Sequence, residues 1–212
     1  EEAFSARGVS LLPADLLVAL REAGANPLLL RLRQGEPAAV LEAIERAGRE
    51  SVPVAERIRW IRLLGELRAS AAVDFLLTLV RTHGPLDPRR VALAALAEFE
   101  EPRIGAALAG TYGDLPAPLR PVAQGVLSSR PGWIPPLLGL LERGGVTAGE
   151  LTAEAALRME ATRDDELKRR FLAWKARRVP RLNEASRQAA ERIRRELAQG
   201  QGSPYRGEPI FT

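Results

Sequence analysis

Few side chains in this sequence are of the types that carry out chemistry, and their spacing indicates structural roles. The one histidine, His83, stands beside Gly84, where a helix is expected to end. A single histidine does not form a His-based metal cluster, and a capping or solvent-exposed role at a helix end is far more common than a catalytic one. Cysteine is absent, which excludes disulfides, thiolate metal sites and cysteine nucleophiles within these residues. We therefore predict that this segment is not an enzyme and has no catalytic, cofactor-binding or metal-binding residue.

Carboxylates cluster at two places, and the second cluster has a simple electrostatic explanation. One cluster holds Glu98, Glu100 and Glu101, and the other is the run 164–166 of two aspartates and a glutamate. The second cluster falls at an expected helix N-terminus, where the helix dipole stabilises each anion by about 0.3–1 kcal/mol. General acid–base chemistry is not needed to explain this second cluster.

Three tryptophans could contact a partner or stack on nucleic-acid bases. Trp60 and Trp174 share their apolar helix stripes with leucine and phenylalanine, which predicts that both lie in the core. Trp133 stands at an expected helix start, where we predict partial exposure. Trp133 is therefore included in a candidate interaction surface.

The remaining members of that surface are basic residues near the end of the chain. Residues 163–206 contain 13 Lys/Arg and 6 Asp/Glu, although the whole chain carries a net charge of only +4. The candidate surface combines Trp133 with Arg187, Arg192, Arg194 and Arg195, which would attract an acidic partner or nucleic acid. No aromatic residues alternate with these arginines, and a solvated, heavily charged helix face is the alternative interpretation.

Composition and apolar spacing predict an all-α fold without a sheet. Alanine, leucine, arginine and glutamate dominate, and 46% of the residues are hydrophobic, enough for a substantial core. The longest apolar runs, such as 134–141, are far shorter than the roughly 18–20 residues that span a bilayer. We expect no membrane span.

Amphipathic helices recur in pairs along the chain. A first helix is expected over about 13–23, a short one over 28–32, and one with the stripe Pro37, Val40, Leu41 and Ile44. The first helices of the later pairs begin near residues 54, 87, 117, 148 and 183, and the last runs to about 199. This interval of about thirty residues, with two helices and no strand, is typical of an α-solenoid of HEAT-like hairpins, with about 11–12 helices in all. The predicted organisation is an irregular arm over 1–10, the solenoid over 11–199, and over 200–212 a linker that opens a downstream domain.

Cap and proline positions refine these helix limits. Asp87, the run Thr147–Glu150 and the run Thr162–Asp165 are predicted to cap helix N-termini. Pro121, Pro135 and Pro136 predict late helix starts or kinks, because proline lacks a backbone donor and clashes with the preceding turn.

Two segments resemble large multidomain c-type cytochromes of planctomycetes and related bacteria. The segment 127–142, Leu-Ser-Ser-Arg-Pro-Gly-Trp-Ile-Pro-Pro-Leu-Leu-Gly-Leu-Leu-Glu, is similar to part of their HEAT-like repeat region. The segment 202–211, Gly-Ser-Pro-Tyr-Arg-Gly-Glu-Pro-Ile-Phe, resembles the opening of their cytochrome c domain, with Ser203 in place of the usual Asp. The resemblance covers roughly residues 119–212.

The resemblance implies a periplasmic or extracytoplasmic spacer between a dehydrogenase-like β-propeller and a cytochrome c domain. Under this hypothesis the parent protein is a redox enzyme, haem c belongs to the downstream domain, and the neighbouring domains are the protein partners. Two other hypotheses remain open: a nucleic-acid-binding HEAT-like protein of the DNA-glycosylase type, and a free-standing scaffold that binds an acidic protein.

Overall fold

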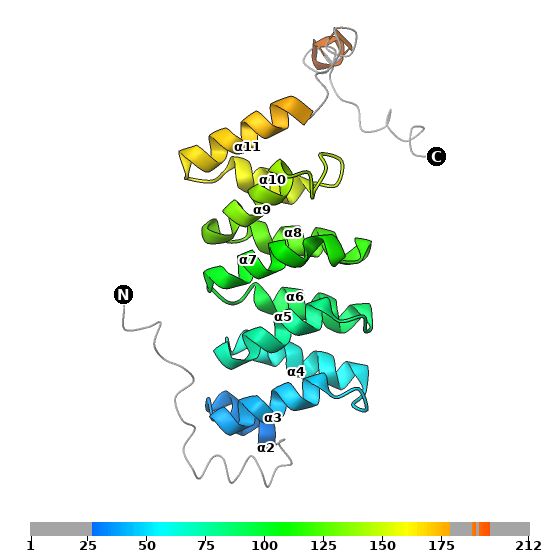
Figure 1. Cartoon of the computed structure of the whole chain (residues 1–212), viewed down its shortest axis with the longest axis vertical. Helices are drawn as coiled ribbons and strands as arrows, with labels where there is room; N and C mark the ends of the chain where they lie inside the picture. The colour runs from blue at the N-terminus through cyan, green and yellow to red at the C-terminus, as the bar shows by residue number, and fades with distance from the viewer. Residues whose placement is uncertain (1–26, 179–187, 190, 196–212) are drawn as a thin grey trace. The chain divides into compact units, whose positions relative to one another are not determined.

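Helices make up most of the part of the chain that the structure describes (Figure 1). The computed structural model describes residues 27–178, 188–189 and 191–195, and no strand occurs in these ranges. The predicted all-α class is thus confirmed there. The predicted arm, the helix over 13–23 and the linker over 200–212 lie outside the described residues. The described helices are α2 (Pro27–Arg33), α3 (Pro37–Gly48), α4 (Val54–Glu66), α5 (Val73–Arg81), α6 (Leu86–Leu96), α7 (Pro102–Thr111), α8 (Arg120–Ser128), α9 (Ile134–Glu142), α10 (Ala153–Glu160) and α11 (Asp165–Arg178).

Short 3₁₀ turns connect several of these helices. They are η1 (Ser70–Ala72), η2 (Tyr112–Asp114), η3 (Ala117–Leu119) and η4 (Pro131–Trp133). Residues 188–189 and 191–195 are helical as well, inside the last helix that the sequence predicts. Backbone contacts divide the chain into two units, Glu1–Leu172 and Ala173–Thr212.

Within the first unit, helices pack against helices two places further along the chain. The even-numbered helices α4, α6, α8 and α10 contact one another in order, and so do α5, α7 and α9 (Figure 1). In addition, α3 packs on α4, α5 on α6 and α7 on α8. Helices α4 to α9 therefore each bury surface against neighbours both along their own row and in the other row.

The closest backbone packing differs from the predicted hairpins. The sequence pairs α4 with α5 across the short connection 67–72, whereas the backbone of α6 approaches both α4 and α5 closely. The absence of a side chain at Gly65 permits this approach, because a Cβ atom there would lie 2.7 Å from the Cβ atom of Ala95. Small residues thus determine which helices come together.

The core follows the predicted apolar stripes in most helices. Ile61, Leu64, Leu76 and Leu93 are fully buried, as are larger side chains in the later helices. In α3 the predicted stripe is wrong, because Leu41 is 62% exposed and the buried positions are Ala39, Ala43 and Ala47. Alanines let α3 pack closely on its neighbours, and a stripe of larger residues does not reveal such a face.

Prolines, rather than carboxylates, precede three of the helical segments. Pro53, Pro85 and Pro116 occupy the N-cap positions of α4, α6 and η3 with extended backbone (ψ 138, 144 and 144°). The predicted cap at Asp87 is therefore wrong, since α6 already begins at Leu86 and no side chain caps it. The prediction of late starts at Pro121, Pro135 and Pro136 is confirmed, because these prolines lie in the first turns of α8 and α9.

The start of α10 lies further along the chain than predicted. Glu150 accepts a hydrogen bond from the Thr147 N–H at 3.0 Å, which holds the pKa of its carboxyl below the usual value. The helix itself begins at Ala153, where the Thr152 hydroxyl accepts from the Ala155 N–H at 3.2 Å. In the predicted cap of α11, the capping residue is Asp164, whose Oδ1 accepts from the N–H groups of residues 166 and 167 at 3.0 Å each.

Candidate functional site

The histidine and the clustered carboxylates lie at separate places in the structure, and several of the carboxylates form ion pairs or helix caps. His83 is exposed in the connection between α5 and α6, next to Thr82, whose hydroxyl bonds back to the Leu79 carbonyl. Glu101 accepts from the Arg103 Nε at 2.6 Å, and Glu100 pairs with Arg130 at 3.4 Å. Among the described residues, no group of three or more His, Asp or Glu side chains is arranged to hold a metal ion.

The three tryptophans are all buried, which confirms two predictions and overturns the third. Trp60 and Trp174 are each 3% exposed, as expected for core residues. Trp133, predicted to be partly exposed, is only 1% exposed. It therefore does not belong to an interaction surface, and none of the three rings is free to stack on a nucleic-acid base.

The neighbouring loop explains why Trp133 is buried. Its indole Nε1–H donates to the Glu101 carbonyl at 3.0 Å, and its ring lies against Gly105, where an added Cβ would be 2.7 Å from Cδ1. Close by, the Arg130 Nη2 donates to the Ala97 carbonyl at 2.9 Å, and its guanidinium lies 5.8 Å from the Trp133 ring centroid. Arg130 and Trp133 thus fasten the α8–α9 connection to the α6–α7 connection.

The basic members of the predicted surface fall at the limit of the described chain. Arg187 lies outside the described residues. Arg192, Arg194 and Arg195 are exposed on the helical segment 191–195, and the Arg195 Nε donates to the Glu191 carbonyl at 3.4 Å. Their predicted role in binding remains a prediction.

A second set of arginines, not predicted from the sequence, donates to backbone carbonyls of the preceding helix or connection, and two of the three are buried. Arg57 and Arg89 are 7% and 4% exposed, and their Nε–H groups donate to the carbonyls of Ala47 at 2.9 Å and Val80 at 3.0 Å. Arg120, at the equivalent place in α8, donates to the Leu115 carbonyl at 3.0 Å. We call these three residues the linking arginines. Arg57 and Arg89 bond to carbonyls in the last turns of α3 and α5, where the helix dipole favours a cation. The Leu115 carbonyl lies after η2, in the connection that follows α7.

The linking arginines have a signature in the sequence. Each follows an N-cap proline by four residues, as Pro53–Arg57, Pro85–Arg89 and Pro116–Arg120, and the copies are 32 and 31 residues apart. The proline ends the preceding connection, and four residues later the arginine lies one turn into the new helix, facing back toward the connection. This Pro-x-x-x-Arg pattern is a sharper signal of the repeat than the apolar stripes.

A buried polar network surrounds Gln124, one turn beyond Arg120 in α8. Gln124 is 1% exposed, and its Nε2 donates to the Tyr112 hydroxyl at 2.7 Å and to the Glu150 carbonyl at 2.9 Å. Its Oε1 accepts from the Thr152 N–H at 2.7 Å. Burial raises the pKa of the Tyr112 phenol above its usual value of 10.0. One side chain thus connects α8 with the segments before and after it.

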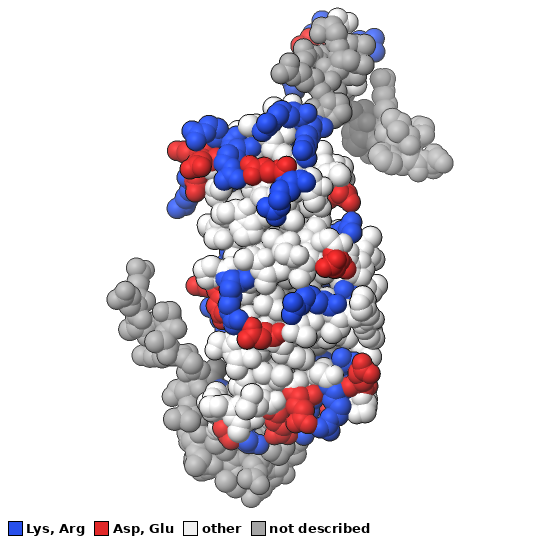
Figure 2. Space-filling model, viewed as in Figure 1, with Lys and Arg blue, Asp and Glu red and all other residues white. Residues whose placement is uncertain are grey.

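Charges of both signs alternate on the visible surface, with Lys and Arg most frequent around α10 and α11 (Figure 2). Several ion pairs connect neighbouring helices, including Arg103–Asp74 at 2.5 Å and Arg170–Glu142 at 2.7 Å. These pairs are exposed, so each contributes at most about 1 kcal/mol to stability.

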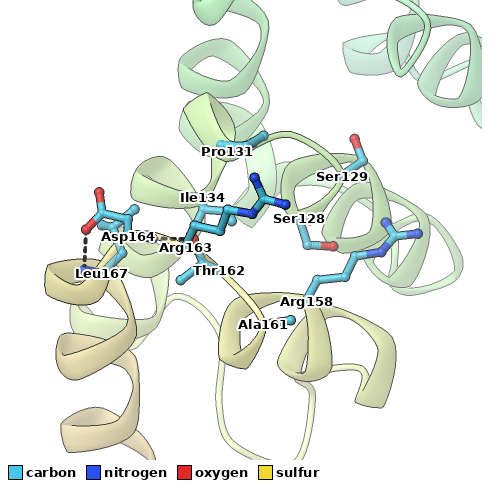
Figure 3. Close-up of a pocket in the computed structure, with 10 residues that line it drawn as sticks. All are labelled: Ser128, Ser129, Pro131, Ile134, Arg158, Ala161, Thr162, Arg163, Asp164 and Leu167. Carbon is cyan, nitrogen blue, oxygen red and sulfur yellow. Dashed lines mark hydrogen bonds between the residues drawn. The ribbon is translucent and has the colours of Figure 1, made fainter.

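A cavity opens between the α8–α9 and α10–α11 connections (Figure 3). Its volume is about 760 Å³, within the range of about 300–1,000 Å³ that is usual for ligand sites. We call it the α10 cavity. Its lining combines apolar residues with hydroxyls and two guanidinium groups: Ser128, Ser129, Pro131, Ile134, Arg158, Ala161, Thr162, Arg163, Asp164 and Leu167.

None of the helices in the described part of the chain combines the length and the apolar character needed to cross a membrane. Comparison with protein-family models, with curated proteins and with solved structures found no significant match to this chain.

Proposed function

We propose that the chain is a HEAT-like α-solenoid that acts as a non-catalytic interaction and spacing module. The observation that carries this proposal is the set of linking arginines, which recur at intervals of 32 and 31 residues and bond to carbonyls of α3, of α5 and of the connection after α7. In repeat proteins a helix pair cannot bury both of its faces alone, so each pair is stabilised by its neighbours. The surface that such an array presents to partners is correspondingly extended.

The proposed role in electron transfer rests on the resemblance of segments 127–142 and 202–211 to planctomycete-type cytochromes. In this proposal the helical array separates a dehydrogenase-like domain from a c-type cytochrome domain outside the cytoplasm. The array itself holds no haem and performs no redox step. Its contribution is to fix the distance between the two partners while keeping them accessible.

Site-specific photo-crosslinking tests the interaction role. A benzoylphenylalanine placed at exposed Leu41, Ala94 or Leu157 is expected to yield crosslinks to a neighbouring domain or protein in the native host. The same group at exposed Arg49, in the connection after α3, serves as a matched control for random collision. Crosslinks that occur equally at all four positions, or at none, would contradict a specific interaction surface.

The cytochrome part of the proposal has its own test. The natural gene product that contains this chain is expected to show the Soret band and the α and β bands of haem c after purification from the host. A gene product without a haem-attachment motif would remove the electron-transfer role. It would leave the proposal of a helical scaffold intact, because the linking arginines do not depend on haem.

A further inference from the structure

We propose that the α10 cavity binds an acidic side chain of a partner protein, with Arg163 as the residue that recognises the carboxylate. This inference rests on the proposed function as an interaction module and specifies the chemistry of one partner segment. Two equivalent spaces between successive helix connections differ in this respect: one is filled by the chain's own side chains, and the other is open.

The filled space lies between the α6–α7 connection and the α8–α9 connection. There the Arg130 guanidinium donates to the Ala97 carbonyl, a residue 33 positions earlier, and Trp133 fills the space above Gly105. An arginine and a large aromatic ring together occupy the space between the two connections.

The open space is the α10 cavity, between the α8–α9 connection and the α10–α11 connection. A shift of 33 residues aligns Ile134 with Leu167, which are both buried, and places Arg163 at the position of Arg130. The same shift aligns Trp133 with Glu166, which is exposed. The Trp133 ring that fills the first space therefore has no aromatic counterpart in the second space, which remains open as the α10 cavity.

Arg163 differs from Arg130 in its hydrogen bonding. No hydrogen bond or ion pair joins Arg163 to any other residue within the described part of the chain. Its guanidinium extends along the cavity toward Ser128 and Ser129 (Figure 3). An arginine presents five N–H donors in a planar fork that matches a carboxylate, so this group is available for a bidentate contact.

The other polar groups of the cavity already have partners. The hydroxyls of Ser128 and Ser129 donate to the carbonyls of Gly125 at 3.1 Å and Val126 at 2.7 Å. Arg158 donates to the same Gly125 carbonyl at 3.0 Å and pairs with Glu154 at 2.6 Å. The Asp164 carboxylate caps α11 and forms no ion pair with Arg163 among the described residues.

The size and apolar part of the cavity favour a peptide over a small inorganic anion. A volume of about 760 Å³ is many times larger than an anion requires. Pro131, Ile134, Ala161 and Leu167 contribute apolar surface beside the guanidinium. The complementary ligand is a carboxylate side chain with an apolar neighbour, as in a Leu-Glu sequence.

Titration of the ¹⁵N-labelled full chain with N-acetyl-Leu-Glu-amide tests this proposal by NMR. We expect saturable shifts of the Arg163 Nε–H signal and of the backbone amides of Ser129 and Thr162, with a dissociation constant in the millimolar range. The matched probe N-acetyl-Leu-Gln-amide, which lacks the charge, should bind at least about tenfold more weakly.

Variants and a third probe assign the binding to this cavity. The substitution Arg163→Gln should weaken binding of the Leu-Glu probe about tenfold, whereas Arg169→Gln, an exposed arginine of α11 outside the cavity lining, should leave it unchanged. Equal binding of the two dipeptides, no saturable shift, or saturable binding of inorganic phosphate alone would each overturn the proposal. Crosslinking at Leu41 and Ala94 is independent of the cavity, so these outcomes would not by themselves contradict the interaction module.

Discussion

Arg57 and Arg89 show how a single buried side chain can join two helices from within an apolar core. Burying a charged guanidinium is costly unless it is hydrogen bonded. Here the helix dipole places partial negative charge near the carbonyls that accept the bonds, which offsets part of this cost. The methylene stem of arginine also adds apolar contact, which explains why the residue fits an interior position.

The substitution Arg89→Met tests this contribution. Methionine retains a flexible apolar stem but removes the donor to the Val80 carbonyl, so the free energy of unfolding should fall by about 1–3 kcal/mol. Urea denaturation followed by circular dichroism measures the change. The neighbouring Arg90→Met is the control, because Arg90 is exposed and its pair with Asp87 spans 3.8 Å. Its effect should stay within about 0.5 kcal/mol, and equal losses in both variants would contradict the role of Arg89.

The Tyr112 phenol gives a second prediction at this scale. Desolvation favours its neutral form in the folded chain, so its pKa should exceed the ordinary value of 10.0. The associated stability is present below the unfolded pKa and is lost as pH rises through the folded pKa. The chain has two tyrosines, so absorbance at alkaline pH in a Tyr205→Phe variant reports Tyr112 alone. Ionisation at the same pH in folded and urea-unfolded protein would contradict the burial effect.

Trp133 shows which property of a residue the sequence does not reveal. Its position at a helix start suggests exposure, and local periodicity contains no information to the contrary. Its burial depends on Gly105 and on the Glu101 carbonyl, which is 32 residues earlier in the chain. Trp60 and Trp174 were predicted correctly because their own helix stripes include them.

At the scale of elements, glycines determine how closely neighbouring helices approach. Two glycines of α7 provide a matched comparison. A Cβ at Gly105 would lie 2.7–2.9 Å from three atoms of Trp133, whereas nothing lies within 4 Å of a Cβ at Gly110. Gly105→Ala should therefore destabilise the fold by about 1–3 kcal/mol through overpacking.

Gly110→Ala should have the opposite sign, with a gain of up to about 1 kcal/mol from reduced backbone entropy in the unfolded chain. Thermal unfolding of the two variants measures both effects. A loss of stability in both variants, or in neither, would contradict the packing of Trp133 on α7. The comparison also separates helix propensity from contact between helices, because both glycines belong to the same helix.

Helix existence could be predicted from the sequence more reliably than helix limits or neighbours. Apolar spacing correctly indicates helices on either side of the connection 67–72, yet it does not show that α6 packs closely on both of them. The start of α10 was misplaced because Thr147–Glu150 has the composition of a capping box, while Thr152 provides the cap. Thr147 and Thr152 are the same residue type and lie five positions apart, so residue type does not distinguish which of them caps the helix. Only their tertiary surroundings differ.

At the scale of the molecule, the interval of about thirty residues was evident from apolar stripes, and the linking arginines give it a physical basis. In an array whose members contact only near neighbours, stability is a sum of intrinsic terms and interface terms. Weakening one interface should then separate the unfolding of the helices on its two sides. A single cooperative domain would instead lose stability throughout.

Fluorotryptophan labelling distinguishes these two cases within one molecule. Trp60 belongs to α4 and Trp133 to η4, so their ¹⁹F signals report helices on opposite sides of the bond between Arg89 and Val80. We expect the two signals to change at the same urea concentration in the unaltered chain, because intact interfaces couple the helices. In the Arg89→Met variant the two midpoints should separate, since the coupling between α5 and α6 is weakened while each helix retains its other contacts. Midpoints that move together to lower urea would contradict the array and favour one indivisible core.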